Sequence, residues 1–277
     1  MYVKRFIFFL CLACAGAAAA TPDIQHWQTE QGARVYFVEA HEIPMVSARV
    51  LFDAGSSRDG ERPGVAMLTS ALLAEGADGL SADQISRGFD DLGANFGAGA
   101  GRDSSYVALQ SLSNPELLGK AAVNLRRVIS APDFPEVALE RERGRLLTTI
   151  RHKQQAPGDI AADAFYAAVY GDHPYAHPPE GTGASVTAIT RDDITGFYKQ
   201  YYTAANAVVA IVGDLSRAQA GQLVDDLLAN LPRGERAPAL PEVPALTEAK
   251  TIRIEHPSTQ MHILMGQPGI GHPKGHR

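Results

Sequence analysis

The chain has 277 residues, of which 45% are hydrophobic and 20% charged, and this composition is typical of globular proteins that bury a sizeable core. This length allows one large domain or two modest ones. Acidic residues outnumber basic ones, 31 to 25, and the basic residues form no stripe along the sequence. The charge balance therefore argues against nucleic-acid binding.

Residues 1–20 predict a secretory signal peptide, with Lys4 and Arg5 before a short apolar run and small residues before the cleavage point. Export to a bacterial periplasm is the simplest interpretation, and lipid attachment at Cys14 is the alternative. Both cysteines, Cys11 and Cys14, lie in this segment, so the remaining chain has no disulfide and no thiolate ligand. No later segment is apolar enough to cross a membrane.

Strands are expected first in the chain, at residues 32–39 and 45–53, where apolar residues alternate with polar ones. Residues 64–74 form an apolar segment that predicts a buried helix. Ser81 and Gln84 have the spacing of a capping box, which predicts a helix from there to about residue 92. Residues 95–100 are small and glycine-rich, and residues 105–112 alternate again as a strand.

Helices are expected to dominate the middle of the chain. Asn114 and Pro115 are a favourable helix start, and further helices are predicted at residues 136–155, 159–170 and 190–202. The valine-rich segment 207–212 predicts a strand covered on both faces, followed by a helix capped by Ser216. Residues 251–254 and 261–265 resemble strands of a second domain. Strands and helices in mixed order indicate an α+β fold, a mixed β-sheet with helices packed on one face.

Five segments together resemble the insulinase/pitrilysin family of zinc metallopeptidases, in particular its two-domain bacterial members and the mitochondrial processing peptidase. They are Phe52 to Ala66, Asp91 to Ala94, Ala131 to Pro135, His173 to Ala176 with Gly181 and Thr182, and Tyr201 to Asp214. The order and spacing of these segments carry the resemblance. It implies an N-terminal insulinase-like domain at residues 21–232, a Pro-rich linker at 233–249, and the start of a truncated second domain at 250–277.

The resemblance also implies where a zinc site would stand. In the family, two histidines four residues apart bind zinc, a glutamate between them activates the metal-bound water, and a later helix supplies a third ligand. Here the histidine positions hold Met67 and Ala71, the base position holds Ser70, and the third ligand falls at Thr149, or at Thr148 if the register slips by one. We therefore expect no zinc and no cofactor, because these residues cannot replace two imidazoles and a carboxylate.

Three other groups of residues are candidates for a site. His173 and His177 stand four apart, but the prolines around them predict a loop rather than a helical ligand pair. The charged run at residues 140–145 predicts a solvated helix face or, alternatively, a wall of a peptide chamber. Gly97 and Ala98 fall where the family carries an edge strand that binds peptide by β-addition, although a purely structural strand is the simpler interpretation.

The resulting hypothesis is a non-catalytic homologue of the insulinase-type peptidases. It would form a heterodimer with an active zinc peptidase, complete the chamber of that enzyme and help to hold its peptide substrate. Two alternatives are a weak metallopeptidase with a non-standard metal site that includes His173, and a periplasmic peptide-binding or scaffold module without a peptidase partner.

Overall fold

A computed structural model describes residues 22–269 and shows one six-stranded sheet in the order β1-β2-β8-β3-β7-β6. Strands β2 and β8 run parallel, and every other neighbouring pair is antiparallel. A second, two-stranded sheet joins β4 to β5. The strands are β1 (Gln25–Gln28), β2 (Arg34–Glu39), β3 (Met45–Phe52), β4 (Gly76–Ala77), β5 (Leu80–Ser81), β6 (Asn95–Ala100), β7 (Ser105–Leu112) and β8 (Ala207–Gly213).

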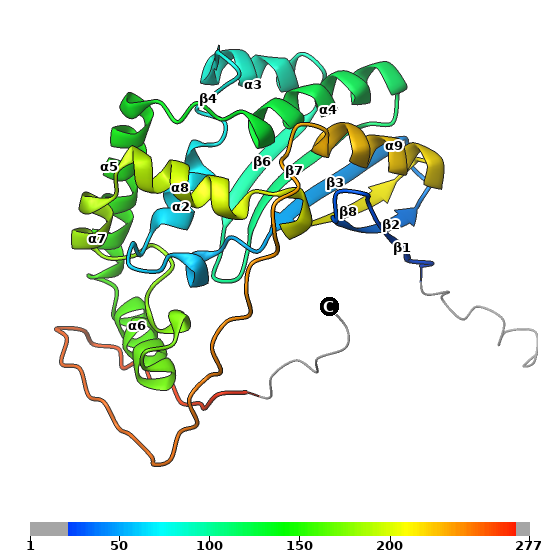
Figure 1. Cartoon of the computed structure of the whole chain (residues 1–277). Helices are drawn as coiled ribbons and strands as arrows, with labels where there is room; N and C mark the ends of the chain where they lie inside the picture. The colour runs from blue at the N-terminus through cyan, green and yellow to red at the C-terminus, as the bar shows by residue number, and fades with distance from the viewer. Residues whose placement is uncertain (1–21, 270–277) are drawn as a thin grey trace, which may run out of the picture.

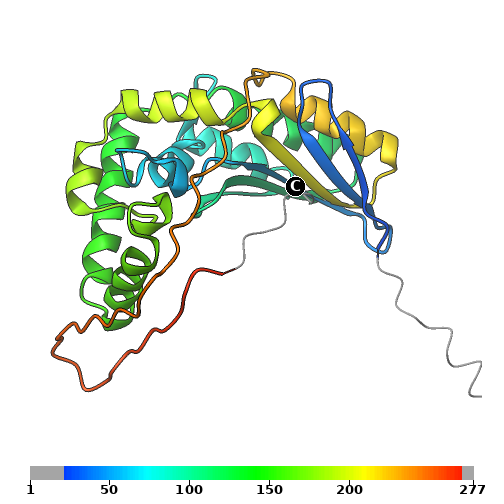
Figure 2. The same ribbon diagram turned by 60° about the horizontal axis from the view of Figure 1, so that its bottom comes forward.

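The helices cover one face of this sheet (Figures 1 and 2). The other face is arched, no helix from the described part of the chain covers it, and it is called the open face. The predicted mixed sheet with helices on one face is therefore confirmed. The α-helices are α2 (Val65–Leu72), α3 (Ala82–Asp90), α4 (Pro115–Ser130), α5 (Glu136–Lys153), α6 (Pro157–Tyr170), α7 (Gly183–Ala188), α8 (Arg191–Tyr201) and α9 (Arg217–Leu228). Short 3₁₀ turns are η2 (Ser56–Arg58), η3 (Pro174–Ala176) and η4 (Ala204–Asn206).

The alternation predicted for β3 and β7 is confirmed. Val46, Val50, Val107 and Leu109 point into the core beneath the helices, with at most 1% of each residue exposed. The prediction that β8 is covered on both faces is wrong. Only alternate residues of β8 are buried, and Val212 is 48% exposed. The run is apolar throughout because its second face belongs to the open side of the sheet, not because a second layer of helices covers it.

Helix starts were the most predictable local features. Ser81 with Gln84 and Ser216 with Gln219 form capping boxes at α3 and α9. The side chain of Asn114 accepts hydrogen bonds from two backbone amides at the start of α4. Helix α7 was missed, since it has only six residues and follows a Pro-rich loop.

The segment 232–269 contains no helix or strand. The strands expected at 251–254 and 261–265 are therefore wrong, because no neighbouring strand pairs with them, and a strand needs a partner for its backbone groups. This segment runs beside α6 (Figure 1). The predicted signal peptide lies outside the described residues. Within residues 22–269, no helix is long and apolar enough to span a bilayer.

Candidate functional site

The resemblance assigns the family's two zinc-binding histidines, its base and its third ligand to Met67, Ala71, Ser70 and Thr149, called the degenerate positions here. Helix α2 carries the first three of them, and Asp59 holds this helix at its first turn. The buried Asp59 carboxylate accepts hydrogen bonds from the backbone amides of Gly64 at 2.7 Å and Ala66 at 3.0 Å. Burial raises the pKa of Asp59 to about 7, and the two amides act in the opposite direction. Gly64 has φ of 101°, and a Cβ there would lie 2.8 Å from the carbonyl oxygen of Glu180, so only glycine fits.

One stripe of α2 faces away from the core. Ala71 is exposed and Met67, one turn earlier on the same face, is half-buried, whereas the other residues of α2 are buried. The prediction that α2 is a buried helix is confirmed for all of its residues except Met67 and Ala71. The two positions where the family would carry histidines therefore coincide with the accessible side of the helix.

Ser70 lies about 100° around the helix from Ala71, on the side that is buried in the core. It is 2% exposed, and its hydroxyl lies near that of Tyr202, which also faces Ser105. Burial raises the pKa of Tyr202 to about 12, while the hydroxyls of Ser105 and Ser70 act in the opposite direction. The residue that the resemblance assigns to the position of the general base is thus packed into the core among hydroxyl groups.

Helix α5 packs against α2 and supplies the fourth position. Thr149 is exposed, and its hydroxyl donates to the backbone carbonyl of Arg145 at 3.2 Å. Thr148, the alternative in a shifted register, donates to the carbonyl of Gly144 at 2.8 Å. A thioether, a methyl group and a hydroxyl already engaged with its own helix do not fit a divalent zinc ion, which takes imidazole, thiolate or carboxylate donors.

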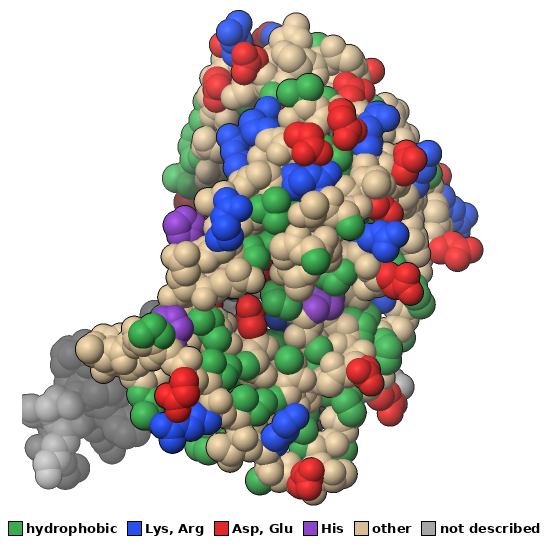
Figure 3. All heavy atoms as spheres, turned by 90° about the vertical axis from the view of Figure 1, so that its left-hand side faces the viewer, with side chains coloured by type: hydrophobic (Ala, Val, Ile, Leu, Met, Phe, Trp, Pro, Cys, Tyr) green, Lys and Arg blue, Asp and Glu red, His purple; other side chains and the backbone are tan. Residues whose placement is uncertain are grey.

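The charged run of α5 is less solvated than predicted. Glu142 is buried, and its carboxylate accepts hydrogen bonds from Arg145 at 2.8 Å and Arg141 at 3.2 Å. Arg141 also pairs with Glu75, three residues beyond the end of α2. These ion pairs link the two helices beside the degenerate positions. On the side of the molecule that includes α5, acidic and basic side chains are interspersed (Figure 3).

Arg143 is the second exception to a solvated α5, since only 9% of it is exposed. Its guanidinium donates to the backbone carbonyls of Val186, Thr187 and Ile189 at the end of α7. These carbonyls have no partner within α7, so a cation there satisfies them and complements the helix dipole. The side chain therefore stabilises the short helix α7 rather than facing a peptide chamber.

Neither loop histidine is arranged to bind a metal. The Nδ1 atom of His173 accepts from the backbone amide of Tyr175 at 3.1 Å, and its Nε2 atom faces the carbonyl oxygen of Pro241 at 3.1 Å and so donates to it. The Nδ1 atom of His177 lies 3.0 Å from the carbonyl oxygen of Pro178. Among residues 22–269, no group of three or more histidine, cysteine, aspartate or glutamate side chains is placed to hold a metal ion.

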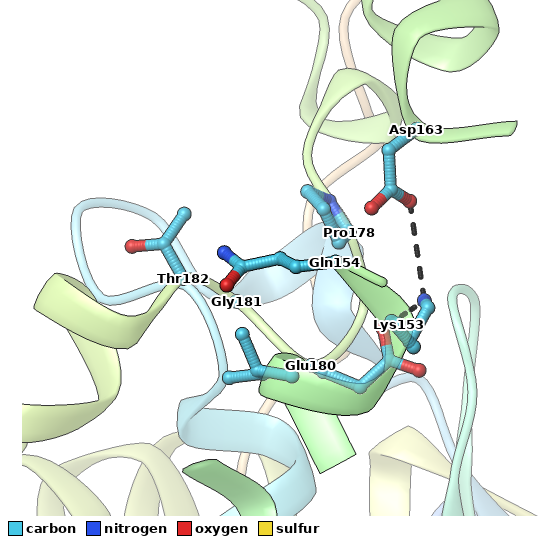
Figure 4. A pocket seen from close by; sticks show the side chains of 8 residues that line it. Lys153, Gln154, Asp163, Pro178, Glu180, Gly181 and Thr182 are labelled. Carbon is cyan, nitrogen blue, oxygen red and sulfur yellow. Dashed lines mark hydrogen bonds and ion pairs between the residues drawn. The ribbon is translucent and has the colours of Figure 1, made fainter. Parts of the chain in front are cut away.

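A polar pocket of about 150 Å³ lies at the end of α5 (Figure 4). Its lining includes Ile150, the residue after Thr149. It is lined by the end of α5, by α6 and by residues 178–182. The Nζ atom of Lys153 in this pocket lies 2.9 Å from a carboxylate oxygen of Glu180 and 3.9 Å from one of Asp163. The charges of the pocket are thus already paired with one another.

Strand β6 is an edge of the sheet, as the resemblance implied for this segment. The register with β7 places Gly97 opposite Ala108 on the open face and Ala98 opposite Val107 on the helix-covered face. The outer side of β6 leaves backbone groups available for pairing with an added strand. Of the two residues named from the sequence, only Gly97 faces the open side.

Comparisons of the sequence and of the structure with known proteins all point to peptidase family M16. The model "Insulinase (Peptidase family M16)" matches residues 34–183, and the model "Peptidase M16 inactive domain" matches residues 188–273. A crystal structure of a peptidase M16 inactive domain from Pseudomonas fluorescens is 39% identical with a TM-score of 0.79, over 80% of this chain and 54% of that one.

Two curated relatives carry different descriptions. An uncharacterized zinc protease of Rickettsia felis is 26% identical over 72% of this chain and 48% of its own length. A non-peptidase homologue of Helicobacter pylori is 23% identical over 84% of this chain and 54% of its own length. The chain thus spans about half the length of these relatives, one of which is named a zinc protease and the other a non-peptidase homologue.

Proposed function

The chain belongs to the insulinase family, peptidase family M16, and from this premise we propose that it is a non-catalytic member that binds peptides instead of cutting them. What carries the proposal is that none of the positions which the resemblance assigns to the catalytic set holds a residue of the right chemistry. These are Met67, Ala71 and Thr149 at the ligand positions and Ser70 at that of the base. Without the metal no water is acidified, and without the glutamate no general base is present.

The scaffold around these positions is intact, which supports a role that depends on shape. The helices cover one face of the sheet, the opposite face is open, and β6 offers an unpaired edge beside it. The names of the inactive relatives fit the same interpretation. We infer that the chain acts in the bacterial periplasm as the partner of an active zinc peptidase and contributes one wall of a shared peptide chamber.

Reconstitution tests this role. The full chain is mixed with a family member from the same cell that carries an intact His-x-x-Glu-His motif, and peptide hydrolysis is followed. The proposal requires a stable complex and faster hydrolysis than the active partner achieves alone. If no complex forms, or if the complex hydrolyses no faster than the partner, the role as partner subunit is wrong. Peptide binding by the chain alone would then leave a peptide-binding module as the function.

A further inference from the structure

The open face of the sheet has an uneven charge distribution. Strand pairing assigns alternate residues to this face, such as Tyr36, Ala108, Val208 and Ala210, and most of them are apolar or small. None of the open-face positions in the six strands is acidic, and two are arginines, Arg34 and Arg49. A surface of this kind favours an anionic group on whatever binds it.

The acidic residues nearest the strand ends are already paired. Asp53, which follows β3, accepts two hydrogen bonds of 2.8 Å from Arg58. Glu39, at the end of β2, lies 2.8 Å from the Nε2 atom of His41. Neither carboxylate is engaged with the open-face arginine of β3, so the positive charge in the middle of the sheet is not neutralised by them.

Arg49 occupies a central position on this face. Its neighbours across the strands are Ala108 on β7 and Ala210 on β8, both small. The Cζ atom lies over the ring of Tyr106, 4.5 Å from the ring centroid. The side chain is exposed, and within residues 22–269 its guanidinium makes no hydrogen bond or ion pair. Stacking on an aromatic ring orients a guanidinium while leaving its N–H edges free.

Tyr106 is itself held in place by the edge strand. It pairs with Gly99 of β6, and a Cβ added to Gly99 would lie 2.8 Å from the Tyr106 ring. Only glycine allows the ring to lie this close to β6. The stack of Arg49 on Tyr106 on Gly99 therefore spans β3, β7 and β6, and it brings the positive charge toward the edge where a peptide strand can add.

We propose that Arg49 is a carboxylate-recognition residue of the open face, selecting extended peptides that carry an aspartate or glutamate side chain. The inference rests on the proposed peptide binding and adds a substrate class to it. The planar guanidinium pairs with a carboxylate through two parallel N–H donors, which an amide of the same shape cannot accept as strongly. Among the open-face positions of the six described strands, no acidic residue competes for this guanidinium.

The test uses end-capped decapeptides of valine, threonine and alanine that carry one central glutamate, glutamine or lysine. Binding to the immobilised full chain is measured by surface plasmon resonance. We expect the glutamate peptide to bind about two- to five-fold more tightly than the glutamine peptide, as for a partly exposed ion pair, and the lysine peptide to bind most weakly. The preference for glutamate shrinks at high salt, because screening weakens an exposed charge pair.

Three variants identify the source of the preference. Arg49→Met should bind the glutamate and glutamine peptides equally, and Tyr106→Leu should lose most of the preference through loss of the stack. Arg217→Met is the matched control, because it removes another arginine that stacks on an aromatic ring. The Arg217 Cζ atom lies 3.1 Å from the centroid of the Trp27 ring, in a contact between α9 and β1. This variant should keep the full preference for glutamate. Equal binding of all three peptides to the wild type, or a preference unchanged in Arg49→Met, overturns the assignment while leaving peptide binding intact. Failure to bind any peptide overturns both proposals.

Discussion

Restoring the missing ligands should restore a zinc site. The variant M67H/A71H/T149E places two imidazoles on the accessible stripe of α2 and a carboxylate on the facing part of α5. Ala71 and Thr149 are exposed and Met67 is half-buried, so the three new side chains displace little of the core. Only Ser70 is left as it is, because it is 2% exposed and packed near Tyr202.

The expected change in stability follows from the burial of the three substituted positions and from the binding of zinc. Substitutions at exposed sites change the free energy of unfolding by about 0.5 kcal/mol each, and the half-buried Met67 adds about 1 kcal/mol. Zinc at about 100 times its dissociation constant stabilises the folded state by about 2.7 kcal/mol. For a folded unit of about 200 residues, this raises the melting temperature by roughly 5–10 °C. Hydrolysis should remain absent, because no general base is restored.

Differential scanning fluorimetry with and without zinc, and with a chelator, measures the effect. The double variant M67H/A71H should show a smaller shift, and M67H/A71H/T148E decides the register, since it moves the carboxylate by 100° around α5. If the T149E triple variant folds but its melting temperature is the same with zinc and with chelator, the three ligand positions do not converge. The assignment of the degenerate site would then be wrong.

Three further predictions concern the fold that carries the site. D59N should remove a pH dependence of the unfolding free energy. The folded pKa of Asp59, about 7, lies above its ordinary 3.8, so the wild-type unfolding free energy should fall as pH rises between these values, and a flat wild-type profile would contradict this. R143M should lower the free energy of unfolding in urea by about 2–4 kcal/mol, because it leaves carbonyls of α7 unpaired. R145M, at an exposed position, should lower it by under about 0.5 kcal/mol. Equal losses in the two variants would refute the capping role of Arg143. Asp214 and Glu39 raise the pKa of His41, so its contribution to stability is complete below pH 6.5 and is lost as pH rises through the folded pKa. The difference in melting temperature between wild type and H41A should therefore shrink as pH rises. A difference that grows with pH would contradict the stabilising role of protonated His41.

Local sequence signals predicted much of the fold. The capping boxes at Ser81 and Ser216 and the alternation in β3 and β7 depend on residues near one another in the chain. The exposure of β8 could not be obtained in this way, since its run of valines fits equally well a strand buried on both faces and a strand whose second face is open. The segment 251–265 has strand-like composition, but composition does not supply a pairing partner.

The degenerate site itself was predicted by alignment to a family pattern, and the structure adds what each residue does. Ser70 points into the core and Ala71 out of it, although they are neighbours in sequence. The stack of Arg49 on Tyr106 could not be predicted, because it depends on the pairing of β3 with β7 and on a glycine in a third strand. Arg143 looked like one member of a solvated charge run until its contacts with α7 were known.

Zinc analysis of the purified full chain, combined with a peptide-hydrolysis assay, tests most directly whether this family member has lost metal chemistry. After incubation with zinc and removal of excess metal, elemental analysis should find far less than one zinc per chain, and hydrolysis should not exceed the background rate with or without a chelator. One zinc per chain together with hydrolysis that a chelator abolishes would contradict the loss of the catalytic site at Met67, Ser70, Ala71 and Thr149.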